Sequence, residues 1–142
     1  MLKVNDTAPD FTLPRDGGGT VTLSALRGAP VVLFFYPKDD TPGCTKESIG
    51  FSADMTAFAA AGAQVFGISK DSVASHDKFV AKHSLSTPLL SDAEGRVACQ
   101  LVGCRGAELA VFYAVTQGGG HIHELAPRPI ERGADDQGFT SL

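Results

Sequence analysis

Residues 31–47 of this 142-residue chain read VVLFFYPKDDTPGCTKE, and this stretch decides the fold. Residues 31–36 form a continuous apolar run of β-branched and aromatic side chains, which is typical of a strand buried on both faces. A polar loop follows, and then Thr41 and Pro42 give a helix start signal: a hydroxyl that can cap the helix, and a proline at the first helical position. The stretch therefore predicts a strand, a loop and a helix with Cys44 in its first turn.

The flanking sequence continues the alternation of strands and helices. The apolar spacing predicts that the helix after Thr41 runs to Gly62, with Phe51, Met55 and Phe58 on its buried face. Further strands are expected at residues 21–23, 64–69, 87–90 and 107–115, and further helices at 71–83 and 97–102. This order predicts an α/β fold, a central sheet flanked by helices, in a single domain over residues 1–142. From about residue 117 the chain is rich in glycine, proline and charge, so we expect residues 117–142 to form a loop-rich tail.

The composition narrows the class of protein. Hydrophobic residues make up 43% of the chain and charged residues 20%, with a net charge of −4, so there is no basic surface to bind nucleic acid. The first residues carry no apolar leader, and no apolar run approaches the roughly 20 residues that span a bilayer. Three cysteines, an odd number, are not typical of a secreted disulfide framework. We expect a cytoplasmic protein that binds neither membrane nor nucleic acid.

Cys44 is the candidate for chemistry. At a helix N-terminus, free backbone N–H groups and the helix dipole lower the pKa of a cysteine, and the thiolate is the nucleophile. A cysteine with an ordinary pKa of about 8.5 is only about 3% ionised at pH 7, so full ionisation accelerates attack only about 30-fold. A thiol enzyme therefore needs hydrogen-bond donors as well, and the Thr41 hydroxyl and the amides of Gly43 and Cys44 are candidates. A single cysteine at a helix start is otherwise most often a buried structural residue.

The pattern Pro37-x-x-x-Thr41-x-x-Cys44 resembles the peroxiredoxin signature. Residues 35–47 as a whole are similar to the peroxiredoxin Q (bacterioferritin comigratory protein) subgroup. Two further segments, APDFTL at 8–13 and GISKDS at 67–72, are similar to the same subgroup. The resemblance covers roughly residues 1–104.

The resemblance implies a thioredoxin-like fold and a peroxidase that reduces hydrogen peroxide and organic hydroperoxides. In the implied roles, Pro37 shields the pocket, Thr41 hydrogen-bonds the thiolate and the peroxide, and Cys44 is oxidised to a sulfenic acid. A second thiol then forms a disulfide with Cys44, and thioredoxin or a similar dithiol reduces it. Neither a metal nor an organic cofactor is implied, and we expect a monomer or a weak homodimer.

Two departures from the subgroup leave alternatives open. Many members carry the resolving cysteine five residues after the peroxidatic one, where this chain has Ile49. Cys99 is the candidate to replace it, with Cys104 or an external thiol as alternatives. In addition, the family arginine beside the thiolate has no matched position, and Arg105, Arg128 and Arg132, the candidates nearest along the chain, are not assigned that role. The pattern stops so abruptly after Gly103 that a reading-frame change is a further hypothesis.

Other signals are given simpler interpretations. His121 and His123 are interpreted as exposed residues of the tail rather than metal ligands, alone or together with Cys99 and Cys104. His76 and His83 are expected on a helix surface. A Cys-x-x-Cys redox pair that begins at Cys44 would need a second cysteine at position 47, where this chain has Glu47. The competing function is a non-enzymatic or crippled thioredoxin-fold module that senses oxidants or binds a partner.

Overall fold

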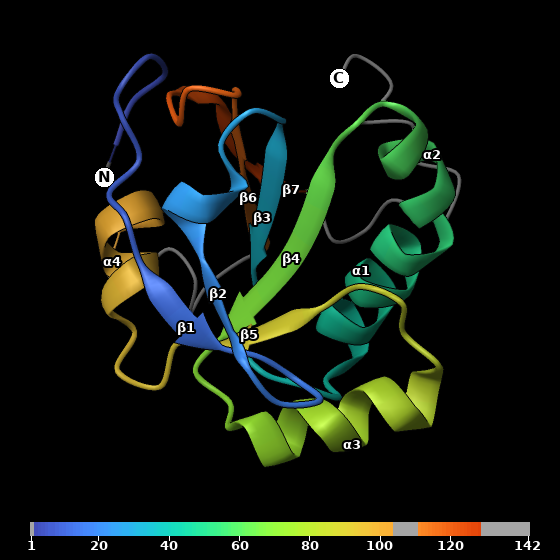
Figure 1. The fold of residues 1–142 in the computed structure, drawn as a ribbon. Helices are drawn as coiled ribbons and strands as arrows, with labels where there is room; N and C mark the ends of the chain where they lie inside the picture. The colour runs from blue at the N-terminus through green and yellow to red at the C-terminus, as the bar shows by residue number, and fades with distance from the viewer. Residues whose placement is uncertain (1, 104–110, 129–142) are drawn as a thin grey trace.

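The computed structural model describes residues 2–103 and 111–128, including all of their side chains except those of residues 42–44, 47, 111–113 and 125–128. Its centre is a five-stranded sheet in the order β5-β4-β3-β6-β7 (Figure 1). The middle strand β3 (Val31–Phe35) is parallel to β4 (Gln64–Ser69), and β4 is parallel to β5 (Leu89–Ser91). On the other side of β3, β6 (Val111–Thr116) and β7 (Ile122–Arg128) form an antiparallel pair. The predicted α/β fold with a central sheet is confirmed.

Alternate residues of β3 belong to two different hydrophobic cores. Val32 and Phe34 point to one side of the sheet together with Tyr36, which follows the strand, whereas Val31, Leu33 and Phe35 point to the other. Every residue of the strand is buried, because helices cover both faces of the sheet. This is why the sequence of β3 is a continuous apolar run rather than an alternating one.

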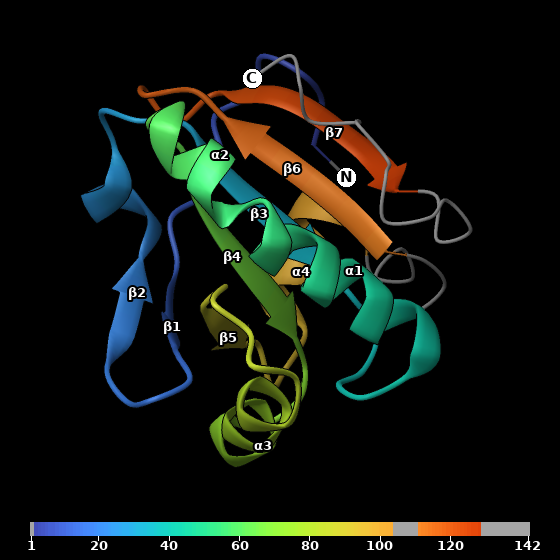
Figure 2. The same ribbon diagram turned by 90° about the vertical axis from the view of Figure 1, so that its right-hand side faces the viewer.

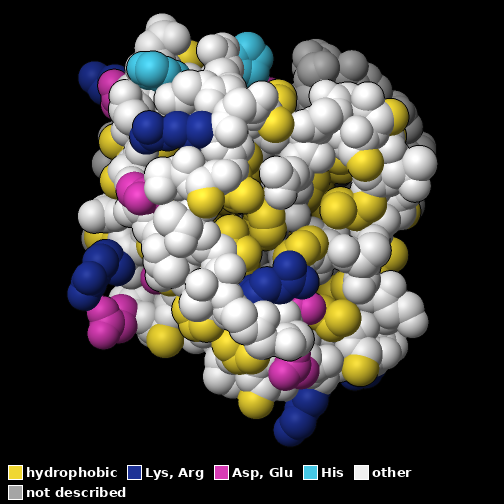
Figure 3. Space-filling model, viewed as in Figure 1, with side chains coloured by type: hydrophobic (Ala, Val, Ile, Leu, Met, Phe, Trp, Pro, Cys, Tyr) yellow, Lys and Arg dark blue, Asp and Glu magenta, His cyan; other side chains and the backbone are white. Residues whose placement is uncertain are grey.

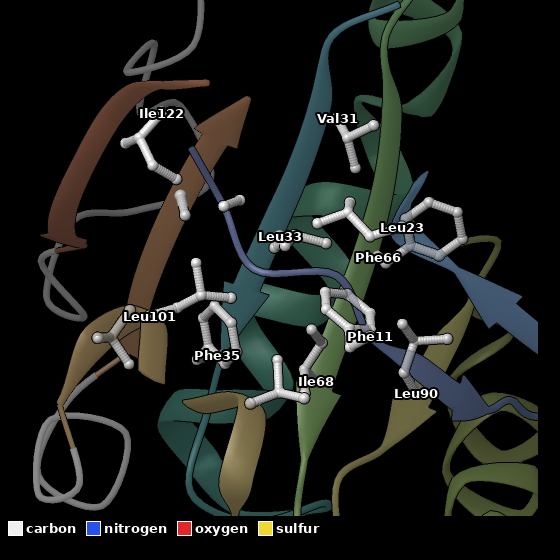
Figure 4. Packing of buried hydrophobic residues seen from close by; sticks show 14 residues of the cluster. Phe11, Leu23, Val31, Leu33, Phe35, Phe66, Ile68, Leu90, Leu101 and Ile122 are labelled. Atoms are coloured by element: carbon white, nitrogen blue, oxygen red, sulfur yellow. The ribbon is translucent and has the colours of Figure 1, made fainter. Parts of the chain in front are cut away.

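The helices form a layer on each face of the sheet (Figures 1 and 2). On one face lie α1 (Pro42–Ala53) and α2 (Met55–Ala60), and Phe79 of α3 (Val73–His83) packs into the same core. On the other face lie α4 (Arg96–Val102), the short helix η1 (Leu23–Leu26) and the segment that leads into the hairpin of β1 (Thr12–Pro14) and β2 (Thr20–Thr22). Figure 4 shows the second core, where Phe11, Leu23 and Leu101 close over the strands.

The single helix expected up to Gly62 is in fact two helices. The chain departs from helical geometry at Asp54, whose backbone N–H is shared between the carbonyls of Gly50 and Phe51, both 3.2 Å away. Phe51 and Phe58 are nevertheless buried in the same core on either side of the break. The expected stop at Gly62 agrees with its positive φ of 75°, a conformation that favours glycine.

The expectation of a loop-rich tail from residue 117 is wrong for residues 122–128, which form the edge strand β7. Ile122 is buried, and its N–H and C=O bond the backbone of Asp6 and Asn5 at 2.7 and 2.8 Å. The glycines at 118–120 form the turn between β6 and β7, with Gly120 at a positive φ. From His121 to His123 the side chains are exposed, buried and exposed in turn, an alternation typical of a strand. The glycine, proline and charged residues around this short segment gave the impression of a loop. Residues 129–142, and residues 107–110 of the strand expected at 107–115, lie outside the described part.

The surface drawn in Figure 3 carries positive and negative side chains interspersed with one another. No helix within residues 2–103 and 111–128 combines the length and the apolar character that a membrane span requires.

Candidate active site

Cys44 is the third residue of α1, as the sequence predicts. The helix begins at Pro42, and its first backbone bond runs from the N–H of Thr45 to the carbonyl of Thr41 at 2.8 Å. Helix geometry leaves the N–H groups of the first turn, those of Gly43 and Cys44 among them, without intrahelical acceptors. The sulfur of Cys44 is outside the described side chains. Its backbone position is nevertheless one where amide dipoles favour a thiolate.

Thr41 does not cap the helix with its side chain, so this part of the expectation is wrong. Its hydroxyl instead donates to the carbonyl oxygen of Lys38 at 3.0 Å, across the loop between β3 and α1. A hydroxyl whose hydrogen is committed in this way still has an oxygen that accepts. It could therefore accept a hydrogen bond from the O–H of a hydroperoxide. Pro37, at the start of the same loop, is exposed.

The loop between β3 and α1, residues 36–41, contains the buried residue Asp39, which is 7% exposed and bonds the protein interior. Its carboxylate accepts hydrogen bonds from the hydroxyls of Tyr36 and Ser75, at 2.6 and 2.9 Å, and from Nδ1 of His76 at 2.7 Å. Its backbone N–H donates to the carboxylate of Asp71 at 2.9 Å. Asp39, two positions before Thr41, is thus bonded to Tyr36 at the start of the loop, to α3 and to the segment after β4.

His76 is fully buried, which corrects the expectation that it lies on a helix surface. Nδ1 faces the Asp39 carboxylate, and Nε2 lies 2.9 Å from the carbonyl oxygen of Leu90. Both partners accept hydrogen bonds, so only the protonated imidazole, with an N–H on each nitrogen, satisfies both contacts at once. Burial opposes the charge, but the hydrogen bond and charge of Asp39, with the Leu90 carbonyl, outweigh it and raise the pKa of His76 above its ordinary value of 6.5.

Two segments that resemble the peroxiredoxin Q subgroup meet at this point. Ser69 donates to the Asp71 carboxylate at 2.6 Å, and that carboxylate also accepts the Asp39 N–H. Burial, and then the charge of Asp39, raise the pKa of Tyr36, which therefore stays a phenol and a donor. No spacing rule in the sequence links Asp39 to Asp71 or to His76. The only sequence signal for these contacts is that the segments around residues 39 and 71 both resemble the same family.

Asp40 faces outward from the same loop. It has a φ of 59°, in the left-handed region that aspartate tolerates, and its carboxylate is 46% exposed. Lys82 and His83, at the end of α3, bond it at 2.7 and 3.1 Å. These two contacts, that of Lys82 first, lower the pKa of Asp40. His83 is only partly exposed, so the expectation of a surface residue holds only in part.

Ser48 and Ile49 are neighbours on α1, and their side chains lie in opposite environments. Ser48, one helical turn after Cys44, is fully buried, and its hydroxyl has no hydrogen-bond partner among the described residues. Ile49, at the position where the resemblance implies a resolving cysteine in many members of the subgroup, is 44% exposed. The helix that begins at the active site therefore has a polar group inside and an apolar one outside.

Cys99 lies on α4 and is disulfide-bonded. The chain has two other cysteines: the side chain of Cys44 and all of Cys104 lie outside the described part. Arg105 and Arg132 also lie outside it, and only the backbone of Arg128 is described, at the end of β7. His121 and His123 are exposed, and the described residues contain no group of three or more His, Cys, Asp or Glu that could hold a metal ion.

Comparison with known proteins agrees with this geometry. The AhpC/TSA family model matches residues 4–117. The putative peroxiredoxin bcp of Coxiella burnetii is 49% identical over 102 residues, which are 72% of this chain and 67% of the relative. Against the chloroplastic peroxiredoxins Q of wheat and rice, which are 49% identical, the match spans only 41–42% of their length.

Two solved structures have the same fold. Peroxidoxin BcpB from Mycobacterium tuberculosis has a TM-score of 0.81 at 37% identity, over 95% of this chain and 90% of the other. The bacterioferritin comigratory protein of Xanthomonas campestris, whose structures concern alkyl peroxide reduction, has a TM-score of 0.72 at 32% identity, over 84% and 81%. The thioredoxin-like fold implied by the resemblance is confirmed. With the strand–loop–helix around Cys44 in place and most of its length matched, the chain belongs to the AhpC/TSA family, and its relatives are peroxiredoxins of the Bcp/Q type.

Proposed function

We propose that this chain is a thiol-dependent peroxidase that reduces hydrogen peroxide and organic hydroperoxides at Cys44. The observation that carries the proposal is the position of Cys44 as third residue of α1, directly after a loop fixed by buried hydrogen bonds. Family membership supports the same reaction, and the structures of the Xanthomonas relative are described as concerning its alkyl peroxide reduction activity. The class of substrate follows from the chemistry: a thiolate attacks the weak O–O bond.

The reaction has two stages. The Cys44 thiolate attacks one oxygen of ROOH: an S–O bond forms, the O–O bond breaks, and RO⁻ leaves as ROH after taking a proton, so that Cys44 becomes a sulfenic acid. A second thiol then attacks that sulfur, water leaves and a disulfide forms. A dithiol of the thioredoxin type supplies the two electrons that restore the thiols.

The residues near Cys44 along the chain are assigned the roles that the resemblance to peroxiredoxins implies. The Thr41 oxygen orients the peroxide by accepting its O–H, and the Gly43 and Cys44 amides stabilise the negative charge that develops on sulfur and oxygen. The resemblance assigns to Pro37, the exposed residue at the start of the loop, the role of shielding the pocket. Without the Thr41 hydroxyl the peroxide loses a positioning contact, and we expect a rate at least about tenfold lower, so Thr41→Val tests this role.

Cys99 is our candidate for the resolving thiol, and its disulfide in the structure supports its ability to form such a bond. When one equivalent of peroxide is added to the fully reduced protein, a Cys44–Cys99 linkage would appear as a mass loss of about two daltons and a cross-linked peptide. Cys99→Ser would leave the first oxidation fast and stop recycling by thioredoxin. Normal recycling in that variant would assign resolution to Cys104 or to an external thiol.

The decisive experiment is Cys44→Ser, assayed for peroxide consumption with a thioredoxin system. We expect essentially complete loss of turnover with an unchanged circular dichroism spectrum. A variant that keeps more than a tenth of the wild-type rate would refute the assignment of Cys44. Cys99→Ser, assayed in single turnover, is the matched control for loss of a cysteine as such.

A second function, a redox sensor or binding module without turnover, is favoured by one observation. Ile49 occupies the position where many relatives carry their resolving thiol. In that case Cys44 would be oxidised once, and thioredoxin would not restore it. Repeated turnover separates the two functions. A cytoplasmic location and a monomeric or weakly dimeric state stay predictions, to be checked by fractionation and by sedimentation.

A further inference from the structure

We propose that His76 is a positioning residue for Cys44: as an imidazolium between Asp39 and the Leu90 carbonyl it fixes the loop that leads into α1, and loss of its proton loosens that loop. The inference rests on the proposed peroxidase function and assigns to that site a control by pH. It concerns a residue on α3, which the chemistry of Cys44 does not itself require.

The loop has few other anchors. Between the end of β3 and the start of α1 it contains only residues 36–41. Asp39 is the buried residue of the segment that follows Tyr36, and it lies five positions before Cys44. The bond from Thr41 to Lys38 stays within the loop, and Asp40 bonds Lys82 and His83 in solvent. Tyr36 anchors the start of the loop, because it is buried and its N–H bonds the carbonyl of Ile68 at 3.1 Å. Beyond Tyr36, the contacts of the loop with the protein interior run through Asp39.

Counting protons shows why His76 acts as a cation. Nδ1 lies 2.7 Å from a carboxylate oxygen and Nε2 lies 2.9 Å from a backbone carbonyl oxygen, and neither oxygen can donate. A neutral imidazole has one N–H, so one of the two contacts must then face a lone pair. Either Asp39 keeps only the neutral hydroxyls of Tyr36 and Ser75, or the buried Leu90 carbonyl loses its donor. Both outcomes weaken the connection between α3 and the loop.

The charged surroundings of His76 set the direction of the pH effect. Asp39 faces it from the loop and Asp71 from the segment after β4, while Tyr36 of the same cluster stays neutral. Two carboxylates near one buried imidazole raise its pKa, although burial alone would lower it. The positioning is therefore complete below the ordinary histidine pKa of 6.5 and is lost as the pH rises through the higher folded-state value.

The observable consequence is an alkaline limb in the rate of Cys44 oxidation. The rate first rises with pH as the thiolate forms, and it then falls as His76 loses its proton and the loop loosens. A misplacement of about 1 Å at a reacting group can lower a rate about 100-fold. For a loop that loosens without unfolding we expect a fall of about tenfold.

Two amide variants separate the two contacts of His76. The side-chain N–H of His76→Asn lies near the place of Nδ1 and can still donate to Asp39, whereas that of His76→Gln reaches toward Leu90 and leaves Asp39 without it. Neither amide titrates. We expect the Asn variant to react within about threefold of wild type at pH 6 and the Gln variant about tenfold more slowly. Neither variant should show the alkaline limb.

The measurement is stopped-flow oxidation of Cys44 by hydrogen peroxide from pH 5 to pH 9. Exposed His121, replaced by Asn, is the matched control and should keep both the rate and the limb. In wild type, the imidazole NMR titration of His76 should coincide with the midpoint of the limb. An alkaline limb that persists unchanged in both His76 variants would overturn the proposal.

Two further readouts keep this test separate from the proposed function and from folding failure. Alkylation of Cys44 by a neutral reagent and amide-exchange protection of residues 39–41 report on the loop without any peroxide. If Cys44 is inert to peroxide but loop protection still falls as His76 titrates, the peroxidase proposal fails and the positioning role stands. If neither His76 variant folds, wild-type protein decides: a His76 titration with no change in loop protection or alkylation refutes the role.

Discussion

Asp39 and Asp40 are neighbours in one loop, both contact α3, and yet they do so in opposite environments. The Asp39 carboxylate reaches His76 in the interior at 2.7 Å, and the Asp40 carboxylate reaches Lys82 on the surface at the same 2.7 Å. The side chains of His76 and Asp39 are 0% and 4% exposed, whereas those of Lys82 and Asp40 are 60% and 46% exposed. The two ion pairs have the same distance but different electrostatic interaction energies, because solvent screens the exposed pair much more than the buried one.

The local backbone explains how consecutive residues come to face opposite ways. Asp40 adopts a φ of 59°, which turns the chain sharply immediately after Asp39. The side chain of Asp39 therefore points into the protein, where Tyr36 and Ser75 also bond it, and the side chain of Asp40 points toward solvent. The inner contact orders the approach to Cys44, and the outer contact adds a bond that salt and water can replace.

The largest expected difference is in stability. Asp39→Asn leaves His76 buried without its anionic partner, and breaking a buried pair in this way costs about 3 kcal/mol or more of the free energy of unfolding. Asp40→Asn should leave that free energy unchanged within the error of urea denaturation. Both are measured at pH 6 with the thiols kept reduced. Equal losses in the two variants would show that burial does not separate the pairs.

The buried pair of Asp39 and His76 should also make the free energy of unfolding depend on pH. The folded-state pKa of His76 is raised, so its contribution to stability is full below pH 6.5 and declines as the pH rises through the folded value. Within that window the free energy of unfolding should fall by about 1.4 kcal/mol per pH unit for one proton. Urea denaturation between pH 6 and pH 9 measures the slope. His76→Asn should lack this component, and an identical slope in that variant would contradict the assignment.

Ser48 offers a smaller effect of opposite sign. It is as buried as His76, but its hydroxyl has no partner among the described residues. A buried polar group without a hydrogen bond costs about 1 kcal/mol or more, so Ser48→Ala should raise the free energy of unfolding by about 1 kcal/mol. The same urea assay tests this, with the partly exposed Ser75→Ala, which loses a bond to Asp39, as the variant expected to destabilise. A destabilised Ser48→Ala would show that the hydroxyl does have a partner.

The smallest effect concerns salt. Lys82 first, and then His83, lower the pKa of Asp40, and an exposed pair is screened by ions. Raising the salt from about 0.05 to about 0.5 M should therefore move the pKa of Asp40 toward its ordinary value, followed by carboxyl NMR. Since that pKa is lowered in the folded state, the pair stabilises above the ordinary value of 3.8 and is lost as the pH falls through the folded value. The His76 titration should hardly respond to the same salt.

Short-range patterns in the sequence predict those elements of the fold that depend on neighbouring residues. The apolar run of β3, the proline at the start of α1 and hence the place of Cys44 all follow from short-range patterns, and the structure has them where they were expected. The β4 strand was also located to the residue, at Gln64–Ser69. These elements are predictable from local sequence because backbone preference and apolar spacing are properties of a short window of chain.

Contacts between residues far apart in the sequence follow from the packing of the fold. It broke the expected helix at Asp54, made an edge strand of residues 122–128 and placed His76 in the interior. A histidine on a helix is compatible with either surface or core, and its burial here depends on Asp39, 37 residues away, and on a carbonyl 14 residues away. No local pattern specifies such pairings, because the free energy that places a charged group inside comes from acceptors that the fold alone brings within reach.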